Sequence, residues 1–86
     1  MLSEKRGMID DIDKKIVALL ERRYKCVSDI KKIKQAEGIS ILDCQREDEV
    51  LEKVRQEVGM KEYEQAIVET FQAMMMISKS YQRANK

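Results

Sequence analysis

The sequence predicts an all-α fold built from three helices, the first of them very long. None of the 86 residues is proline, three are glycine, and 38% are charged, with both signs interleaved along the chain. Such a composition is typical of long helices with wet outer faces, and it is unlike that of a sheet protein or a disordered tail. Apolar residues also recur at intervals of three and four positions, the spacing of one helix face. We expect a single domain over residues 1–86.

The first helix is expected from about residue 3 to residue 37. Its apolar series starts at Ile9 and continues at helical spacing to Ile33, and Gly38 follows as a candidate C-terminal cap. A helix of this length would measure roughly 50 Å, whereas a compact chain of 86 residues is only about 30 Å across. Its own chain is too small to cover it, so we expect a homodimer in which a second copy covers the remainder.

Two shorter helices complete the predicted fold. After a short apolar loop at residues 39–42, Asp43 is a plausible N-cap for a second helix over about 43–58, which Gly59 is expected to end. The third helix is expected over about 60–84. Both helices carry apolar residues at helical spacing on one side, so each should pack by that face.

One residue interrupts the apolar series of the first helix. Arg23 follows Leu19 by four positions, where the spacing predicts an apolar side chain. Taking a guanidinium out of water costs several kcal/mol unless acceptors compensate. Arg23 therefore needs a negatively charged neighbour, either a protein carboxylate or a ligand. Lys34 lies eleven residues further on, about three helical turns, and projects from nearly the same face.

The other two predicted helices also carry polar residues on the faces that we expect to point inward. Glu47, with Arg46 beside it, precedes the apolar Val50 by three positions, which places it toward the core. Ser78 and Gln82 are four positions apart on the apolar side of the third helix. Taken together, these residues predict a cavity that is rich in cations and contains one carboxylate.

Each of these residues also has a purely structural explanation. Arg23 and Glu47 could form a buried ion pair that fixes helix register or oligomeric state. Lys34 could extend to solvent at the end of its helix, while Ser78 and Gln82 could be ordinary surface residues. Their joint occurrence favours a polar cavity over these separate explanations.

The composition excludes several classes of function. Because histidine is absent, Ser-His catalysis and histidine-ligated zinc are excluded, and there is no glycine-rich phosphate loop. A net charge of +1 without a long basic block gives no nucleic-acid footprint, and no segment reads as a signal peptide or a membrane span. Cys26 and Cys44 are interpreted as free thiols in a reducing cytoplasm. What remains is recognition of a small dianionic ligand, with no metal or cofactor.

Five segments resemble the all-α (AroQ-type) chorismate mutases. The first three, which are similar to the family's first helix, are IDDID at 9–13, LLERR at 19–23 and KKIK at 31–34. DCQRE at 43–47 resembles the D-x-x-R-E start of its second helix, and SKSYQ at 78–82 resembles the S-x-x-x-Q segment of its last helix. The resemblance covers nearly the whole chain, and the segments occur in the family's order with compatible intervals.

The resemblance implies an intertwined three-helix homodimer with two active sites. It also implies the Claisen rearrangement of chorismate to prephenate, a step towards phenylalanine and tyrosine. By position, Arg23 and Arg6 of the partner subunit would hold the two carboxylates of the substrate, with Arg46 and Ser78 assisting nearby.

The same resemblance assigns residues to the reacting end of the substrate. Lys34 and Gln82 would donate hydrogen bonds to the ether oxygen, where negative charge develops as the C–O bond breaks. Glu47, helped by the backbone N–H of Asp43, would take the ring hydroxyl. Because the amide of Gln82 always carries its protons, we predict no acid-shifted activity optimum from this position.

Two alternatives stand beside the mutase. Isochorismate pyruvate lyases share the fold and most of the cations, although Glu47 and Ser78 favour the mutase. A non-catalytic helical dimerisation or regulatory module would show no turnover, and its binding would be insensitive to Arg23→Ala or Gln82→Ala.

Overall fold

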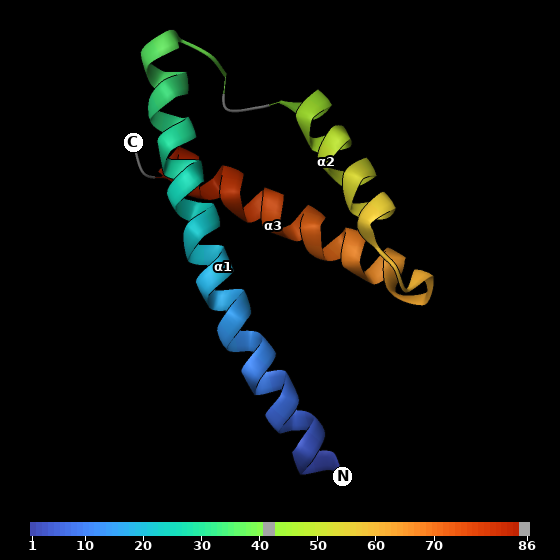
Figure 1. The fold of residues 1–86 in the computed structure, drawn as a ribbon. Helices are drawn as coiled ribbons and strands as arrows, with labels where there is room; N and C mark the ends of the chain where they lie inside the picture. Colours follow the sequence, from blue (N-terminus) through green and yellow to red (C-terminus); the bar gives the residue numbers. More distant parts are fainter. Residues whose placement is uncertain (41–42, 85–86) are drawn as a thin grey trace.

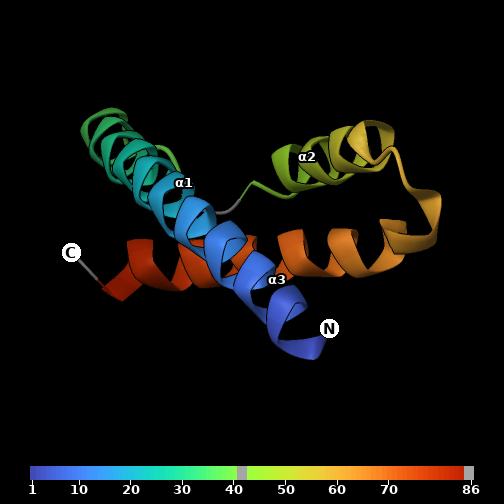
Figure 2. The same ribbon diagram turned by 60° about the horizontal axis from the view of Figure 1, so that its bottom comes forward.

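The computed structural model describes residues 1–40 and 43–84, and within them it contains three α-helices and one short 3₁₀ turn (Figure 1). The helices are α1 (Leu2–Glu37), α2 (Cys44–Glu57) and α3 (Glu64–Ala84). α3 packs against both other helices, crossing the C-terminal half of α1 and running beside α2 (Figures 1 and 2). The predicted all-α fold with one very long helix is confirmed.

The molecule is extended. Its principal extents are 53 × 24 × 16 Å and its radius of gyration is 15.7 Å, whereas a compact chain of this length would have a radius of gyration of about 12 Å. The accessible surface is 7144 Å², compared with about 5,300 Å² for a compact monomer of the same mass. The excess arises because the first half of α1, residues 2–19, projects beyond the other helices (Figure 1). We refer to this segment as the N-terminal arm.

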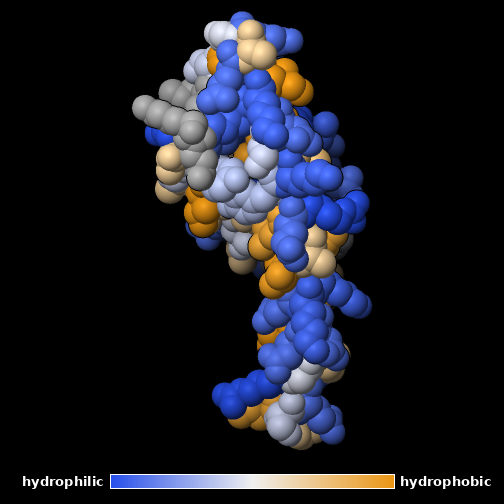
Figure 3. All heavy atoms as spheres, turned by 90° about the vertical axis from the view of Figure 1, so that its left-hand side faces the viewer, coloured by the Kyte–Doolittle hydropathy of each residue, from blue (hydrophilic) through white to orange (hydrophobic). Residues whose placement is uncertain are grey.

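The arm carries an apolar face that its own chain does not cover. The residues that form the predicted apolar series remain about half exposed: Ile9 at 54%, Ile12 at 52%, Ile16 at 45% and Leu19 at 57%. Hydrophobic atoms accordingly reach the surface between charged ones along the arm (Figure 3). In the described residues the buried apolar side chains are Val27, Val58 and Val68, which is a small core for three helices.

Both caps predicted around the first connection are present. Gly38 ends α1 with φ 69° and ψ 25°, the left-handed conformation that glycine adopts without a steric penalty. Asp43 caps α2, because its Oδ1 accepts a hydrogen bond of 3.0 Å from the backbone N–H of Arg46. Part of the expected apolar loop between them, Ile41 and Leu42, lies outside the described residues.

The second helix ends close to the predicted residue, but not for the predicted reason. We expected Gly59 to terminate it, but α2 ends at Glu57 and the next residue, Val58, is extended with φ −68° and ψ 115°. Gly59 has no positive φ. The side chain of Val58 is only 9% exposed, so burial of a valine, and not the freedom of a glycine, accompanies the end of this helix.

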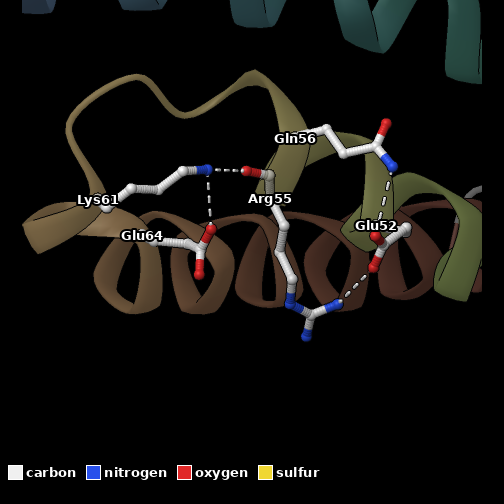
Figure 4. A network of polar contacts seen from close by, with 5 residues as sticks. All are labelled: Glu52, Arg55, Gln56, Lys61 and Glu64. Atoms are coloured by element: carbon white, nitrogen blue, oxygen red, sulfur yellow. Dashed lines mark hydrogen bonds and ion pairs between the residues drawn. The ribbon is translucent and has the colours of Figure 1, made fainter.

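The third helix begins later than predicted. Residues 61–63 form a 3₁₀ turn, η1 (Lys61–Tyr63), and α3 starts at Glu64 instead of residue 60. Met60 is extended, with φ −95° and ψ 94°. The turn is held by Lys61, whose Nζ donates to the Arg55 carbonyl at 2.8 Å and lies 3.2 Å from Glu64 Oε1 (Figure 4). These tertiary contacts replace the helical turn that periodicity alone predicted.

Two further findings concern the chain as a whole. Cys26 and Cys44 are exposed free thiols, as predicted. Across residues 1–40 and 43–84, no helix is both long enough and apolar enough to cross a membrane.

Candidate active site

A cavity of about 280 Å³ lies where the C-terminal half of α1, the start of α2 and the end of α3 meet. Its apolar lining includes Val27 and Ile30 of α1, Val50 of α2 and Met75 of α3. Its polar lining contains seven of the eight residues that the sequence predicted for the site: Arg23, Lys34, Asp43, Arg46, Glu47, Ser78 and Gln82. Residues 59 positions apart in the chain therefore share one cavity.

Arg23 and Ser78 join α1 to α3 at one wall of the cavity. Arg23 Nη1 donates a hydrogen bond of 3.1 Å to Ser78 Oγ, and this hydroxyl donates in turn to the Met74 carbonyl at 2.9 Å. Ser78 is 5% exposed, so its interpretation as a surface residue is wrong. No carboxylate of the described residues lies within ion-pair distance of Arg23. Its guanidinium has no carboxylate partner among the described residues, and its hydrogen bond is to the neutral hydroxyl of Ser78.

Gln82 lies one turn further along α3. It is 9% exposed, and its Oε1 accepts no hydrogen bond from the described residues. A buried amide oxygen without a partner costs about 1–3 kcal/mol, and such groups in native proteins require an explanation. A polar ligand that enters the cavity supplies one. Lys34, which is half-buried on α1, lines the same space.

The start of α2 contributes one further cation and two carboxylates. Asp43 and Glu47 both line the cavity, and Asp43 is at the helix N-terminus, where backbone N–H groups are unpaired. The side chain of Arg46 is 59% exposed, and its Nη1 lies 3.9 Å from Glu49 Oε2.

Glu47 pairs with a cation that the sequence did not predict for the site. Its Oε1 lies 2.8 Å from Lys79 Nζ, and each side chain is 28% exposed. The ion pair between Arg23 and Glu47, the structural alternative from the sequence, is therefore not formed. Lys79 also lines the cavity. The available signal was its position three residues before Gln82, which places both on neighbouring parts of one helix face.

Comparison with known proteins connects this cavity to a family. The family described as chorismate mutase type II matches residues 5–83 of the chain. The chain belongs to this family. A chorismate mutase from Methanocaldococcus jannaschii is 31% identical to it over 83 residues, which cover 95% of this chain and 84% of that protein. No solved structure matches the chain significantly. The mutase is thus an isomerase, and its reaction implies a place in aromatic amino acid biosynthesis.

The charge of the cavity suits the substrate of a chorismate mutase. Four cations line it, Arg23, Lys34, Arg46 and Lys79, together with two carboxylates, so that the formal net charge is +2. Chorismate carries two carboxylates, and a concave site with the opposite charge raises the local concentration of such a ligand.

A second, larger cavity of the mutase has a different character. It measures about 570 Å³, lies between α2 and α3 away from the α1 crossing, and has walls formed by Val54, Val58, Ile67 and Phe71 with few polar groups. Arg46 is its one member from the predicted site. Two cations, Arg46 and Lys53, line this larger cavity, whereas four cations and the amide and hydroxyl of Gln82 and Ser78 line the smaller one, so the smaller cavity is the candidate active site.

Arg6 is the predicted site residue that this chain does not bring to the cavity. It lies on the exposed N-terminal arm, near the free end of α1. The arm projects away from α2 and α3 (Figure 1), so a contact between Arg6 and a site requires the site of another molecule.

Proposed function

We propose that the cavity between the three helices is the active site at which chorismate rearranges to prephenate. In this proposal Arg23 binds one substrate carboxylate, and Ser78 and Arg46 assist it. The hydrogen bond from Arg23 to Ser78, at 3.1 Å, supports a preorganised guanidinium whose other N–H groups can form a bidentate pair with a carboxylate.

The reaction itself requires positioning and electrostatic stabilisation. A pericyclic rearrangement needs neither a nucleophile nor a general base, so the protein must hold the enolpyruvyl side chain over the ring in a reactive geometry. Negative charge then develops on the ether oxygen as its C–O bond breaks. Lys34 and Gln82 are the proposed donors to this oxygen, and donors fixed before the reaction favour the transition state over the ground state.

Glu47 is the proposed partner of the ring hydroxyl. A carboxylate that accepts this hydrogen bond orients the ring, and the backbone N–H of Asp43 at the start of α2 adds a donor on the same side. The position of both residues in the cavity lining supports this assignment.

One observation carries the proposal: seven residues selected from the sequence, drawn from three helices, line a single small cavity. The test is to mix purified protein with chorismate, follow its loss by absorbance, and convert the product with acid to phenylpyruvate. Arg23→Ala should lower kcat/KM by about 10-fold to 100-fold, the value of a charged hydrogen bond. Arg22→Ala, which removes the exposed neighbouring guanidinium, is the matched control. Pyruvate release from isochorismate without prephenate formation would instead assign the protein to the lyases.

We further propose that the active form is a homodimer. The accessible surface of one chain exceeds that of a compact monomer by about 1,800 Å², and its exposed apolar residues are concentrated on the N-terminal arm. The apolar cavity between α2 and α3 is a second surface that its own chain leaves open. A second copy that covers these surfaces would remove most of this apolar area from water.

In the dimer, Arg6 of the partner subunit is proposed to complete each site. A mixture of Arg6→Ala and Arg23→Ala proteins tests this. Each variant alone should be strongly impaired, whereas a mixed dimer contains one site with both arginines and one with neither. Activity should therefore reappear on mixing, after subunit exchange. If Arg6 acts within its own chain, mixing restores nothing. The free thiols of Cys26 and Cys44 support our placement of the enzyme in the reducing cytoplasm.

A further inference from the structure

The ion pair between Glu47 and Lys79 differs from the other ion pairs of the described residues. Those pairs join residues three positions apart on one helix or turn: Arg46–Glu49, Glu52–Arg55 and Lys61–Glu64. The pair of Glu47 and Lys79 instead joins α2 to α3 at 2.8 Å, with both side chains 28% exposed. A pair that bridges two helices fixes a side chain relative to the whole site, and not only to its own turn.

Glu47 has open space on two sides. Together with Lys79 and Met75 it lines the active-site cavity, and the same three residues line a neighbouring cavity of about 400 Å³, which also contains Asp48 and Gln72. Glu47 therefore stands in the wall between the two. Without a fixed partner its carboxylate could rotate toward either cavity, because no other described residue forms an ion pair with it.

The geometry of the pair leaves Glu47 able to act. Lys79 engages Oε1, and a carboxylate has two oxygens with about four acceptor positions in all. Oε2 can therefore accept a hydrogen bond from a ligand while Oε1 stays with the ammonium. One oxygen positions the side chain, and the other is available to the substrate.

We propose that Lys79 is a positioning residue that holds the Glu47 carboxylate on the active-site side of this wall. This inference rests on the proposed role of Glu47 as acceptor of the ring hydroxyl. Lys79 itself is the partner of Glu47, and its effect on the reaction passes through that carboxylate. Lys79 lies within the segment 78–82, which resembles the S-x-x-x-Q segment of the family, but it occupies a position that this motif leaves unspecified.

A double-mutant cycle tests the proposal in the full-length protein. Chorismate turnover is measured for Lys79→Met, Glu47→Gln and the double variant, with kcat and KM determined separately. Lys79→Met keeps the length of the side chain and removes the charge. We expect it to lower kcat by about 10-fold to 100-fold in the parent protein, the scale on which misplacement of a group that positions substrate acts. In the Glu47→Gln background it should cost little more, and Lys79→Arg should retain most of the activity.

The control is Arg83→Met, which removes a cation from the exposed surface of the same helix and should leave turnover unchanged. Circular dichroism and molar mass confirm that each variant keeps its fold, and Lys79→Gln replaces Lys79→Met if that variant does not fold. An equal loss from Lys79→Met in both backgrounds overturns the proposal, because Lys79 would then act on the substrate without Glu47. Full activity of Glu47→Gln overturns the proposed role of Glu47 itself, and with it the inference.

Discussion

The two halves of α1 have the same helical periodicity but different environments. In the C-terminal half, residues 20–37, α3 crosses the helix, Val27 is 9% exposed, and Arg23 and Lys34 line the active-site cavity. In the N-terminal arm Ile9 and Ile12 are more than half exposed, and Ile30 and Ile33, which continue this apolar series into the C-terminal half, are also exposed, at 45% and 55%. Helical spacing alone therefore does not tell which apolar positions of α1 its own chain covers, because this depends on where another helix crosses it.

The two halves of α1 therefore have different proposed tasks. The C-terminal half combines a small core with Arg23 and Lys34, which are proposed to bind the substrate and to stabilise its transition state. The N-terminal arm provides apolar surface, and in the proposed dimer it delivers Arg6 to another molecule. Substitutions in the two halves should therefore have separable effects on catalysis and on assembly.

The largest expected effect is at the cavity. Gln82→Ala removes a proposed donor to the ether oxygen and should lower kcat by about 10²–10³-fold, by analogy with the loss of an oxyanion-hole donor. Its molar mass and helical content should remain those of the parent protein. Gln65→Ala, an exposed glutamine on the same helix, is the matched control. Unchanged kcat in Gln82→Ala would falsify the assignment of this cavity as the active site.

The next effect is on the arm. Ile12→Asn places a polar amide on the apolar face, and burial of an isoleucine side chain is worth about 1.5–3 kcal/mol. Because both copies carry the change, the dissociation constant of the dimer should rise roughly 100-fold or more. Sedimentation or light scattering over a concentration series measures this. The matched control is Asp13→Asn, which introduces asparagine at the neighbouring exposed position and should leave the dimer intact. Equal behaviour of the two variants would mean that this face is not an interface.

Gln82→Glu is expected to have a smaller effect, which depends on pH. A neutral carboxylic acid can donate to the ether oxygen, whereas a carboxylate cannot, and glutamate is ordinarily ionised at neutral pH. Activity at pH 7 should therefore fall roughly tenfold or more and recover as the pH is lowered. A pH–rate profile of kcat beside that of the parent protein checks this. If the profile of the variant keeps the shape of the parent profile, the residue is not a proton-carrying donor.

The smallest effects compare a glycine inside the arm with the glycine that caps the C-terminal end of α1. Gly38 has φ 69°, so Gly38→Ala should destabilise the protein by about 1 kcal/mol. Gly7 lies inside the arm with nothing within 4 Å of an added Cβ, so Gly7→Ala should stabilise the helix by up to about 1 kcal/mol. Thermal unfolding should thus shift in opposite directions for the two variants. A destabilising Gly7→Ala would indicate close approach of a second chain at that turn.

Local rules predicted much of the fold. Periodicity placed α1 within about one residue of its observed bounds, and the caps at Gly38 and Asp43 were identified because capping depends only on adjacent residues. The junction of α2 and α3 was predicted incorrectly. Its geometry depends on burial of Val58 and on a side-chain bond from Lys61 to the Arg55 carbonyl, and neither follows from periodicity.

The sequence by itself determined the helices and, through the motifs they carry, the residues of the candidate site. A polar side chain on an apolar face is a local property, and a helix of fixed pitch sets the relative direction of Arg23 and Lys34. Only the tertiary structure decided how these faces meet. The crossing of α3 over α1 buries Ser78 and Gln82 and leaves the arm uncovered, and the packing of α2 on α3 pairs Glu47 with Lys79 instead of Arg23. Those outcomes depend on contacts between segments far apart in the chain, which side-chain periodicity along one helix does not specify.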